Sequence, residues 1–199
     1  IRLYNIHTQE LYAGLLDYVK HFAEERDIWV GVDFKEDKEK YTKQMVYRYL
    51  EKLNIHAAGE KITPHQHQVE AIQKSLNERR TLLLSPTASG KSLIIYMLAR
   101  HYPMKKLIVV PTTGLVHQMA SDFAEYGYED EVHKITAGAS KEIESNITVT
   151  TWQSIYKMPR KWFEQFKVVI GDEAHLFKAK SLTNIMSKLV QCPYKFGFT

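Results

Sequence analysis

Hydrophobic residues follow two periods along this chain, and the change between them separates strands from helices. From residue 80 onward, short and nearly continuous apolar runs alternate with longer segments in which apolar residues recur every three or four positions. The runs predict strands over 81–84, 106–110, 132–135, 147–150, 167–170 and 194–198. The periodic segments predict helices over 64–77, 91–101, 113–126 and 181–190. Strands that are apolar throughout need cover on both faces, so the alternation predicts an α/β fold with a mostly parallel sheet between two helical layers.

The first 60 residues resemble a smaller α/β piece. The spacing of apolar residues predicts a helix through Leu11, Leu15, Val19 and Phe22, a strand over 28–32, and a second helix through Val46, Tyr49, Leu50 and Leu53. Residues 54–61 include Ala-Ala-Gly and are the expected linker. We therefore predict two domains: an incomplete accessory domain over residues 1–60 and a main domain over residues 61–199.

Composition narrows the class of protein. Of 199 residues, 44% are hydrophobic and 25% are charged, which is the balance of a chain that buries a core and excludes a disordered or fibrous protein. The single cysteine, Cys192, forms neither an internal disulfide nor a zinc site by itself, so the sequence is typical of an intracellular protein. The chain starts at Ile1 without a methionine and stops at Thr199 within an apolar stretch, from which we expect a fragment.

The charge is divided unevenly between the two predicted domains. The whole chain has 27 basic and 23 acidic residues, a net charge of +4. Residues 1–60 hold 9 basic and 11 acidic residues (9 − 11 = −2), which leaves 18 and 12 (18 − 12 = +6) for residues 61–199. The excess is compatible with a polyanionic partner but is too modest to establish one.

Chemistry is expected where strands turn into helices, because ligands of open parallel sheets bind beyond the carboxyl ends of the strands. The first such turn reads Ser85-Pro86-Thr87-Ala88-Ser89-Gly90-Lys91-Ser92. A glycine-containing turn that opens a helix points backbone N–H groups at a phosphate; Lys91 then reaches the β- and γ-phosphates and Ser92 ligates magnesium. Ser85 stands where the usual pattern has its first glycine. The alternative is an ordinary strand-to-helix turn with a chance Lys-Ser pair.

A second turn carries two acids. The predicted strand over 167–170 is followed by Gly171 and then by Asp172-Glu173-Ala174-His175, 172 − 91 = 81 residues beyond the phosphate lysine. A carboxylate here, Asp172, holds magnesium, and the next, Glu173, polarises water for attack on the γ-phosphate. The alternative is an acidic turn that caps a helix. Two motifs in this order at two strand ends favour a site for ATP and Mg²⁺.

These motifs carry a family resemblance. Asp172-Glu173-Ala174-His175 is the DEAH form of the acidic box of superfamily 2 helicases, and the chain resembles more closely the helicases of this kind from T-even-type bacteriophages. Further matching segments are Val110-Pro111-Thr112-Thr113, Gln118-Met119-Ala120, Gly138-Ala139-Ser140-Lys141, Thr151-Trp152-Gln153-Ser154 and Tyr194-Lys195-Phe196-Gly197. The resemblance covers nearly the whole chain. It implies that residues 61–199 are the first RecA-like, P-loop domain of the motor, without the second RecA-like domain.

The resemblance also implies roles for two polar residues near the phosphate loop. Gln68 matches the glutamine that reads the adenine edge, for which its amide supplies one donor group and one acceptor. The alternative is a polar residue on the exposed side of the helix over 64–77. His175 matches the residue that links the nucleotide state to the next motif, which begins near Phe196.

Three further segments resemble the motifs that grip the nucleic-acid backbone. Small hydroxyl side chains and free N–H groups at a helix start suit phosphate oxygens and contact DNA without reading bases. The alternative is structural, since threonines are good helix caps, and Trp152 between two of these residues is better explained as a core residue than as a base-stacking one. The candidate contacts are Pro111, Thr112, Thr113, Gly138, Thr151 and Gln153.

The resemblance implies an ATP-dependent DNA helicase that acts on branched or single-stranded DNA, with RNA–DNA hybrids as a further substrate. It implies a place in the host cytoplasm, and a fragment without its second motor domain is expected to hydrolyse ATP weakly. Two alternatives remain open at this point. One is another superfamily 2 motor, such as a restriction-enzyme translocase or a repair helicase. The other is a P-loop protein that is not a motor, such as a nucleotide switch or a kinase.

Overall fold

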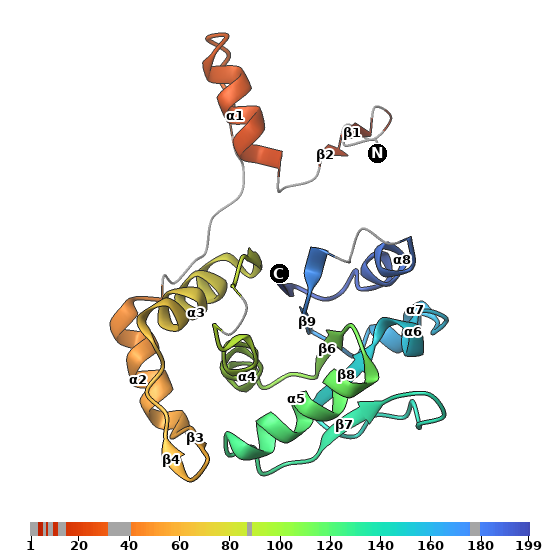
Figure 1. The fold of residues 1–199 in the computed structure, drawn as a ribbon. Helices are drawn as coiled ribbons and strands as arrows, with labels where there is room; N and C mark the ends of the chain where they lie inside the picture. The colour runs from red at the N-terminus through yellow and green to blue at the C-terminus, as the bar shows by residue number, and fades with distance from the viewer. Residues whose placement is uncertain are drawn as a thin grey trace. The chain divides into compact units, whose positions relative to one another are not determined.

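The computed structural model describes residues 4–5, 7, 10–11, 15–31, 41–86, 89–175 and 180–199. The chain forms two compact units, residues 1–38 and 39–199, which are taken separately below. Figure 1 shows the helices and strands of both. No helix in the described ranges is long and apolar enough to cross a lipid bilayer.

The first unit contains a short antiparallel pair, β1 (Tyr4–Asn5) and β2 (Glu10–Leu11), and the helix α1 (Leu16–Glu24). The strand predicted over 28–32 is wrong over its described part, because residues 28–31 have no strand structure; residue 32 lies outside the described residues. Trp29 is 88% exposed and Ile28 55% exposed. The described strands of this unit, β1 and β2, pair with each other, and without a partner of its own a short apolar run does not form a strand.

The second unit is built on a six-stranded sheet in which every neighbouring pair is parallel. The strand order is β5-β10-β9-β6-β8-β7. The strands are β5 (Arg80–Leu83), β6 (Lys106–Val110), β7 (Val132–Ile135), β8 (Ile147–Thr151), β9 (Val168–Gly171) and β10 (Tyr194–Phe198). All six strands predicted in this part of the chain are present, and the predicted α/β class is confirmed.

Helices cover both faces of this sheet, as predicted, and Figure 1 shows them on its two sides. Successive side chains of a strand point to opposite faces, so Ile108 and Val110 join one core while Leu107 and Val109 join the other. The helices packed on the first core are α2 (Lys43–Leu53), α3 (Gln66–Glu78), α4 (Lys91–His101) and α5 (Thr113–Glu125). The second core is covered by α6 (Trp152–Ile155), α7 (Arg160–Phe163) and α8 (Lys180–Lys188), of which the two short helices were not predicted.

Residues 41–60 belong to the second unit and pack with its sheet. Val46, Leu50 and Ile55 are buried in the same core as α4. The predicted linker 54–61 contains a hairpin, β3 (His56–Ala57) and β4 (Glu60–Lys61), so the linker assignment is wrong. Its Ala-Ala-Gly makes a tight turn, since Ala58 and Gly59 both have positive φ. The compact units therefore divide at Lys38, and a domain boundary near residue 60 stays a prediction.

Candidate functional site

All the candidate loops lie along one edge of the sheet, the edge that is formed by the carboxyl ends of its strands. They follow the carboxyl ends of β5, β9, β6, β8 and β7, and carboxyl ends of parallel strands share an edge. The strand order divides this edge into two parts. We call the ends of β5, β10 and β9 the nucleotide half, because they carry the phosphate loop and the acidic box. The ends of β6, β8 and β7 carry the proposed DNA-contacting loops and are called the nucleic-acid half.

The phosphate loop leads from β5 into α4, with Gly90 as the N-cap residue in the left-handed conformation (φ 75°). The positive φ favours glycine, and a Cβ atom at this position would also displace the amide nitrogen of Gln68. The hydroxyl groups of Ser85 and Ser89 share a short hydrogen bond across the loop, and the Ser89 N–H donates to the Pro86 carbonyl at 3.2 Å. The predicted residues Thr87 and Ala88 lie outside the described residues.

Lys91 and the acidic box meet directly. The Lys91 Nζ lies 2.9 Å from the Glu173 Oε1. The other oxygen of this carboxylate, Oε2, lies 3.4 Å from the His175 Nδ1, which is also 2.7 Å from the Thr199 Oγ1. The structure thus brings three predicted residues together and adds Thr199, which follows β10 in the segment where the next motif begins.

Glu173 has a left-handed backbone (φ 52°), which costs a residue other than glycine roughly 1–2 kcal/mol. Such strain persists where the surrounding structure holds it, and it is concentrated at functional sites. Here it accompanies the carboxylate that faces Lys91.

Asp172 directly precedes Glu173, and its backbone is held by the neighbouring strand. Its backbone N–H donates to the Val109 carbonyl at 2.9 Å, which ties the acidic box to the neighbouring strand β6. Burial raises the pKa of its carboxyl, and the positive charge of Lys91 opposes that shift. Among the described residues no group of three or more His, Cys, Asp or Glu could hold a metal. Magnesium takes one or two carboxylates and completes its shell with phosphates and water, so Asp172 is the type of ligand that it uses.

Ser92, the other predicted magnesium ligand, already has a hydrogen-bond partner within the protein. Its hydroxyl lies 3.0 Å from the Tyr126 hydroxyl, at the end of α5. Burial raises the pKa of the nearby Asp122 carboxyl, and the Ser92 hydroxyl opposes that shift. No sequence pattern pointed to Tyr126 or Asp122, and ligation of magnesium by Ser92 stays a prediction.

Gln68 lies against the phosphate loop and is only 3% exposed. Its amide oxygen accepts from the His65 N–H at 2.9 Å, and its amide nitrogen donates to the Ser89 carbonyl at 3.1 Å. The alternative of an exposed polar residue is therefore wrong, whereas contact with adenine stays a prediction. His67, which was not predicted, places its Nε2 3.1 Å from the same carbonyl.

A cavity of about 430 Å³ opens beside the phosphate loop. It offers space for a ligand next to the residues that hold Ser89. Its lining comes from α3, β5, the loop and α4: His67, Ala71, Leu83, Leu84, Ser85, Pro86, Ser89 and Ile94.

In the nucleic-acid half the candidate side chains are caps and exposed groups. Thr112 is the N-cap of α5 and its hydroxyl accepts from the Leu115 N–H at 3.3 Å. Thr113 is exposed and Pro111 is half-buried at the end of β6. The helix start that these residues form leaves N–H groups free, as contact with phosphate requires.

The loops after β7 and β8 complete this half. Gly138 turns the chain with a positive φ of 81° and nothing lies within 4 Å of a Cβ built there. Thr151 is only 4% exposed and its hydroxyl lies 3.0 Å from that of Ser154, whereas Gln153 is exposed. Trp152 packs against the second core, in agreement with its expected structural role. The roles of Gly138, Thr151 and Gln153 stay predictions.

Comparison with known proteins identifies the family. The family model described as "Type III restriction enzyme, res subunit" matches residues 61–199. The chain belongs to this family. Over 198 residues it is 38% identical to the ATP-dependent DNA helicase uvsW of Enterobacteria phage T4. This match covers 94% of this chain and 39% of the relative. It is also 28% identical over 141 residues to the DNA 3'-5' translocase XPB2 of Sulfurisphaera tokodaii, covering 70% of this chain and 31% of that protein.

Solved structures agree with this family assignment. A crystal structure of the UvsW helicase from bacteriophage T4 superimposes with a TM-score of 0.86 at 37% identity, covering all of this chain and 74% of that one. The SWI2/SNF2 ATPase core of Sulfolobus solfataricus, solved with double-stranded DNA, covers 73% of this chain and 32% of the other at a TM-score of 0.59 and 15% identity, a likeness of fold alone. The predicted resemblance to phage superfamily 2 helicases and the RecA-like fold are confirmed. The chain spans about two fifths of the T4 relative's length.

Proposed function

We propose that this chain is the first motor domain of an ATP-dependent DNA helicase that acts on branched DNA. The observation that carries the proposal is the contact between Lys91 and Glu173, which joins the phosphate loop to the acidic box at one sheet edge. The similarity to a phage DNA helicase supports DNA as the substrate and the host cytoplasm as the location. Branched DNA is the proposed main substrate, and RNA–DNA hybrids are a further one.

The chain's own residues supply most of the chemistry. The Lys91 ammonium exchanges its partner Glu173 for the β- and γ-phosphates of ATP, and Glu173 is then free to orient water and accept its proton. Asp172 and Ser92 would hold magnesium, which neutralises phosphate charge when bound. Gln68 and His67 fix Ser89, so the loop keeps its shape while phosphate binds.

The DNA would cross the other half of the edge through its phosphates. N–H groups at the start of α5 and the loops after β7 and β8 contact the backbone and leave the bases unread. A translocating motor needs contacts that do not depend on sequence, and such contacts weaken steeply as salt rises.

ATP hydrolysis by the full-length protein, measured with and without branched DNA, tests this function. We expect DNA to stimulate hydrolysis and the Glu173→Gln variant to lose about 10²- to 10⁴-fold in kcat while still binding nucleotide. The 199-residue chain alone is expected to hydrolyse ATP slowly, because the partner domain of the motor supplies the other half of the cleft. Wild-type hydrolysis that ignores DNA would contradict a motor.

A second candidate function is translocation along DNA without strand separation. The family description and the translocase named among the relatives favour it. Displacement of a triplex-forming strand reports translocation, and release of a duplex strand reports unwinding. A protein that does the first without the second is a translocase.

A further inference from the structure

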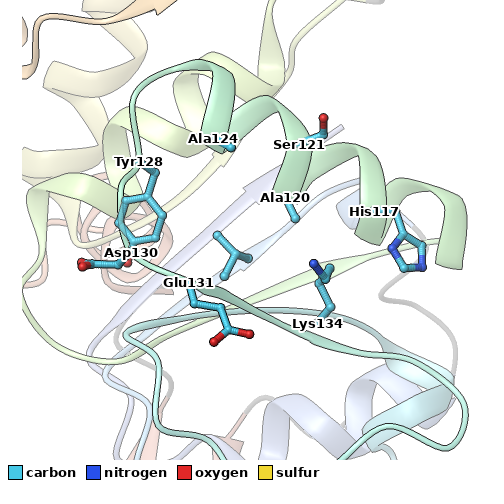
Figure 2. Close-up of a pocket in the computed structure, with 9 residues that line it drawn as sticks. His117, Ala120, Ser121, Ala124, Tyr128, Asp130, Glu131 and Lys134 are labelled. Atoms are coloured by element: carbon cyan, nitrogen blue, oxygen red, sulfur yellow. The ribbon is translucent and has the colours of Figure 1, made fainter.

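A groove of about 340 Å³ lies between α5 and the edge strand β7, and none of the candidate site residues named above lines it. Figure 2 shows its side chains, with α5 on one side and the strand on the other. The lining residues are His117, Ala120, Ser121, Ala124, Tyr128, Asp130, Glu131, Val132 and Lys134.

The two ends of this groove differ in charge. His117 and Lys134 lie toward one end and Asp130 toward the other, with Glu131 between Asp130 and Lys134 (Figure 2). His117 follows the start of α5 by one helical turn, and Lys134 is the next-to-last residue of β7. The basic end is therefore the end beside the nucleic-acid half, because α5 starts and β7 ends at that sheet edge.

Both basic-end side chains are available to a ligand. His117 and Lys134 are exposed, and neither has a hydrogen-bond or ion-pair partner within the described ranges. The Lys134 ammonium offers three donors and a charge, and the His117 ring offers at least one N–H in either tautomer. The Ser121 hydroxyl, one turn further along α5, adds another donor to the same groove.

We propose that the basic end of the groove binds a backbone phosphate of the nucleic acid as it leaves the loop around Gly138. The inference rests on the proposed function and extends its binding surface past the last strand of the sheet. Because β7 is the edge strand, nucleic acid that passes over β6, β8 and β7 has this groove as its next surface. The carboxylates of Asp130, at the other end, and of Glu131, in between, repel phosphate and so limit the contact to Lys134 and His117.

The contact predicts a measurable change in salt dependence. A lysine that neutralises one phosphate of a single strand releases about 0.7 counterion, which at 0.1 M salt is worth roughly fivefold in affinity. Since phosphate is common to DNA and RNA, the effect should be equal for the two polymers, whereas a contact to bases or to the 2′-hydroxyl would separate them.

The test compares Lys134→Gln with Lys52→Gln, because Lys52 is an exposed lysine on α2 and its removal changes the net charge equally. Binding of fluorescent single-stranded DNA and RNA of one sequence is measured by anisotropy across a salt series, with the 199-residue chain. For Lys134→Gln we expect about fivefold weaker binding at 0.1 M salt and a salt slope smaller by about 0.7 for both polymers. Lys52→Gln should match the unaltered chain, and Glu131→Gln should bind about twofold tighter.

Equal slopes for Lys134→Gln and Lys52→Gln, with the unaltered chain still binding, would overturn this inference and leave the proposed function standing. A chain that binds neither polymer at low salt would overturn both. Thermal unfolding of each variant shows whether it is folded, and the exposed position of Lys134 predicts no change in the melting temperature.

Discussion

The two halves of the sheet edge use their side chains differently. In the nucleotide half the candidate side chains bind one another: Lys91 pairs with Glu173, Glu173 with His175, and His175 with Thr199. In the nucleic-acid half the candidates cap helices or face solvent, as Thr112 and Gln153 do.

The difference follows from what each half would bind. Phosphate transfer needs charges at fixed positions. In the absence of the ligand, these charged groups are stabilised by partner side chains that the ligand later replaces. Gripping a uniform backbone needs N–H groups at helix starts, which the fold supplies without a special set of side chains. The nucleotide half should therefore be sensitive to single side chains, and the nucleic-acid half should be tolerant.

Lys91→Ala is the largest expected effect and tests that contrast directly. Loss of the ammonium removes a charge-assisted bond to phosphate, so nucleotide affinity should fall about 10- to 100-fold. DNA affinity should stay within twofold, because Lys91 belongs to the other half of the edge. Equilibrium binding of a fluorescent ATP analogue and of labelled DNA measures both, and equal losses would show that the halves are not separate.

Lys106→Met has the next largest expected effect. It should change the stability of the fold without altering either half of the sheet edge. Lys106 begins β6, at the opposite end of the strand from Pro111, and is only 4% exposed. Burial lowers the pKa of its ammonium to about 8, with Arg100 acting in the same direction and Asp130 against it. Methionine has a similar length and no charge to bury. We expect the variant to gain on the order of 1–3 kcal/mol in the free energy of unfolding at pH 7.

The gain should depend on pH in a defined window. The unfolded chain holds the Lys106 proton up to its usual pKa of 10.5, whereas the folded chain releases it near pH 8. Between these values the unfolded chain binds more protons, so the wild-type protein becomes more stable as pH rises. The advantage of Lys106→Met is therefore full below about pH 8 and shrinks toward pH 10.5. Urea unfolding of both proteins at several pH values measures it, and a difference that is constant with pH would show that Lys106 is not buried as a charge.

Much of the fold could be predicted from periodicity, because strands and helices are local patterns. The runs that became β6 and β10 were predicted with their bounds, 106–110 and 194–198. The run over 28–32 was equally apolar but formed no strand in its described part. A strand depends on a partner, and partners are chosen by packing that a single segment does not encode.

The candidate site was predictable in its residues but not in its contacts. Motif order placed Lys91 and Glu173 at two strand ends, yet their ion pair joins residues 82 positions apart and depends on the strand order. The Tyr126 contact to Ser92 and the His67 contact to Ser89 were not predicted. Such partners depend on how helices pack on the sheet, which the sequence pattern leaves open.

Thr112→Ala is the smallest expected effect, and a matched control makes it decisive for the nucleic-acid half. Thr42 caps α2 just as Thr112 caps α5, and each hydroxyl accepts from the N–H three residues on at 3.3 Å. Loss of either cap should cost about 1 kcal/mol of unfolding free energy. If the start of α5 grips DNA, Thr112→Ala should also weaken DNA binding by about two- to threefold, since a loosened helix start presents its N–H groups less well, while Thr42→Ala should not. Equal DNA affinity in the two variants, at equal loss of stability, would reduce Thr112 to a structural cap and move the backbone contact elsewhere on that edge.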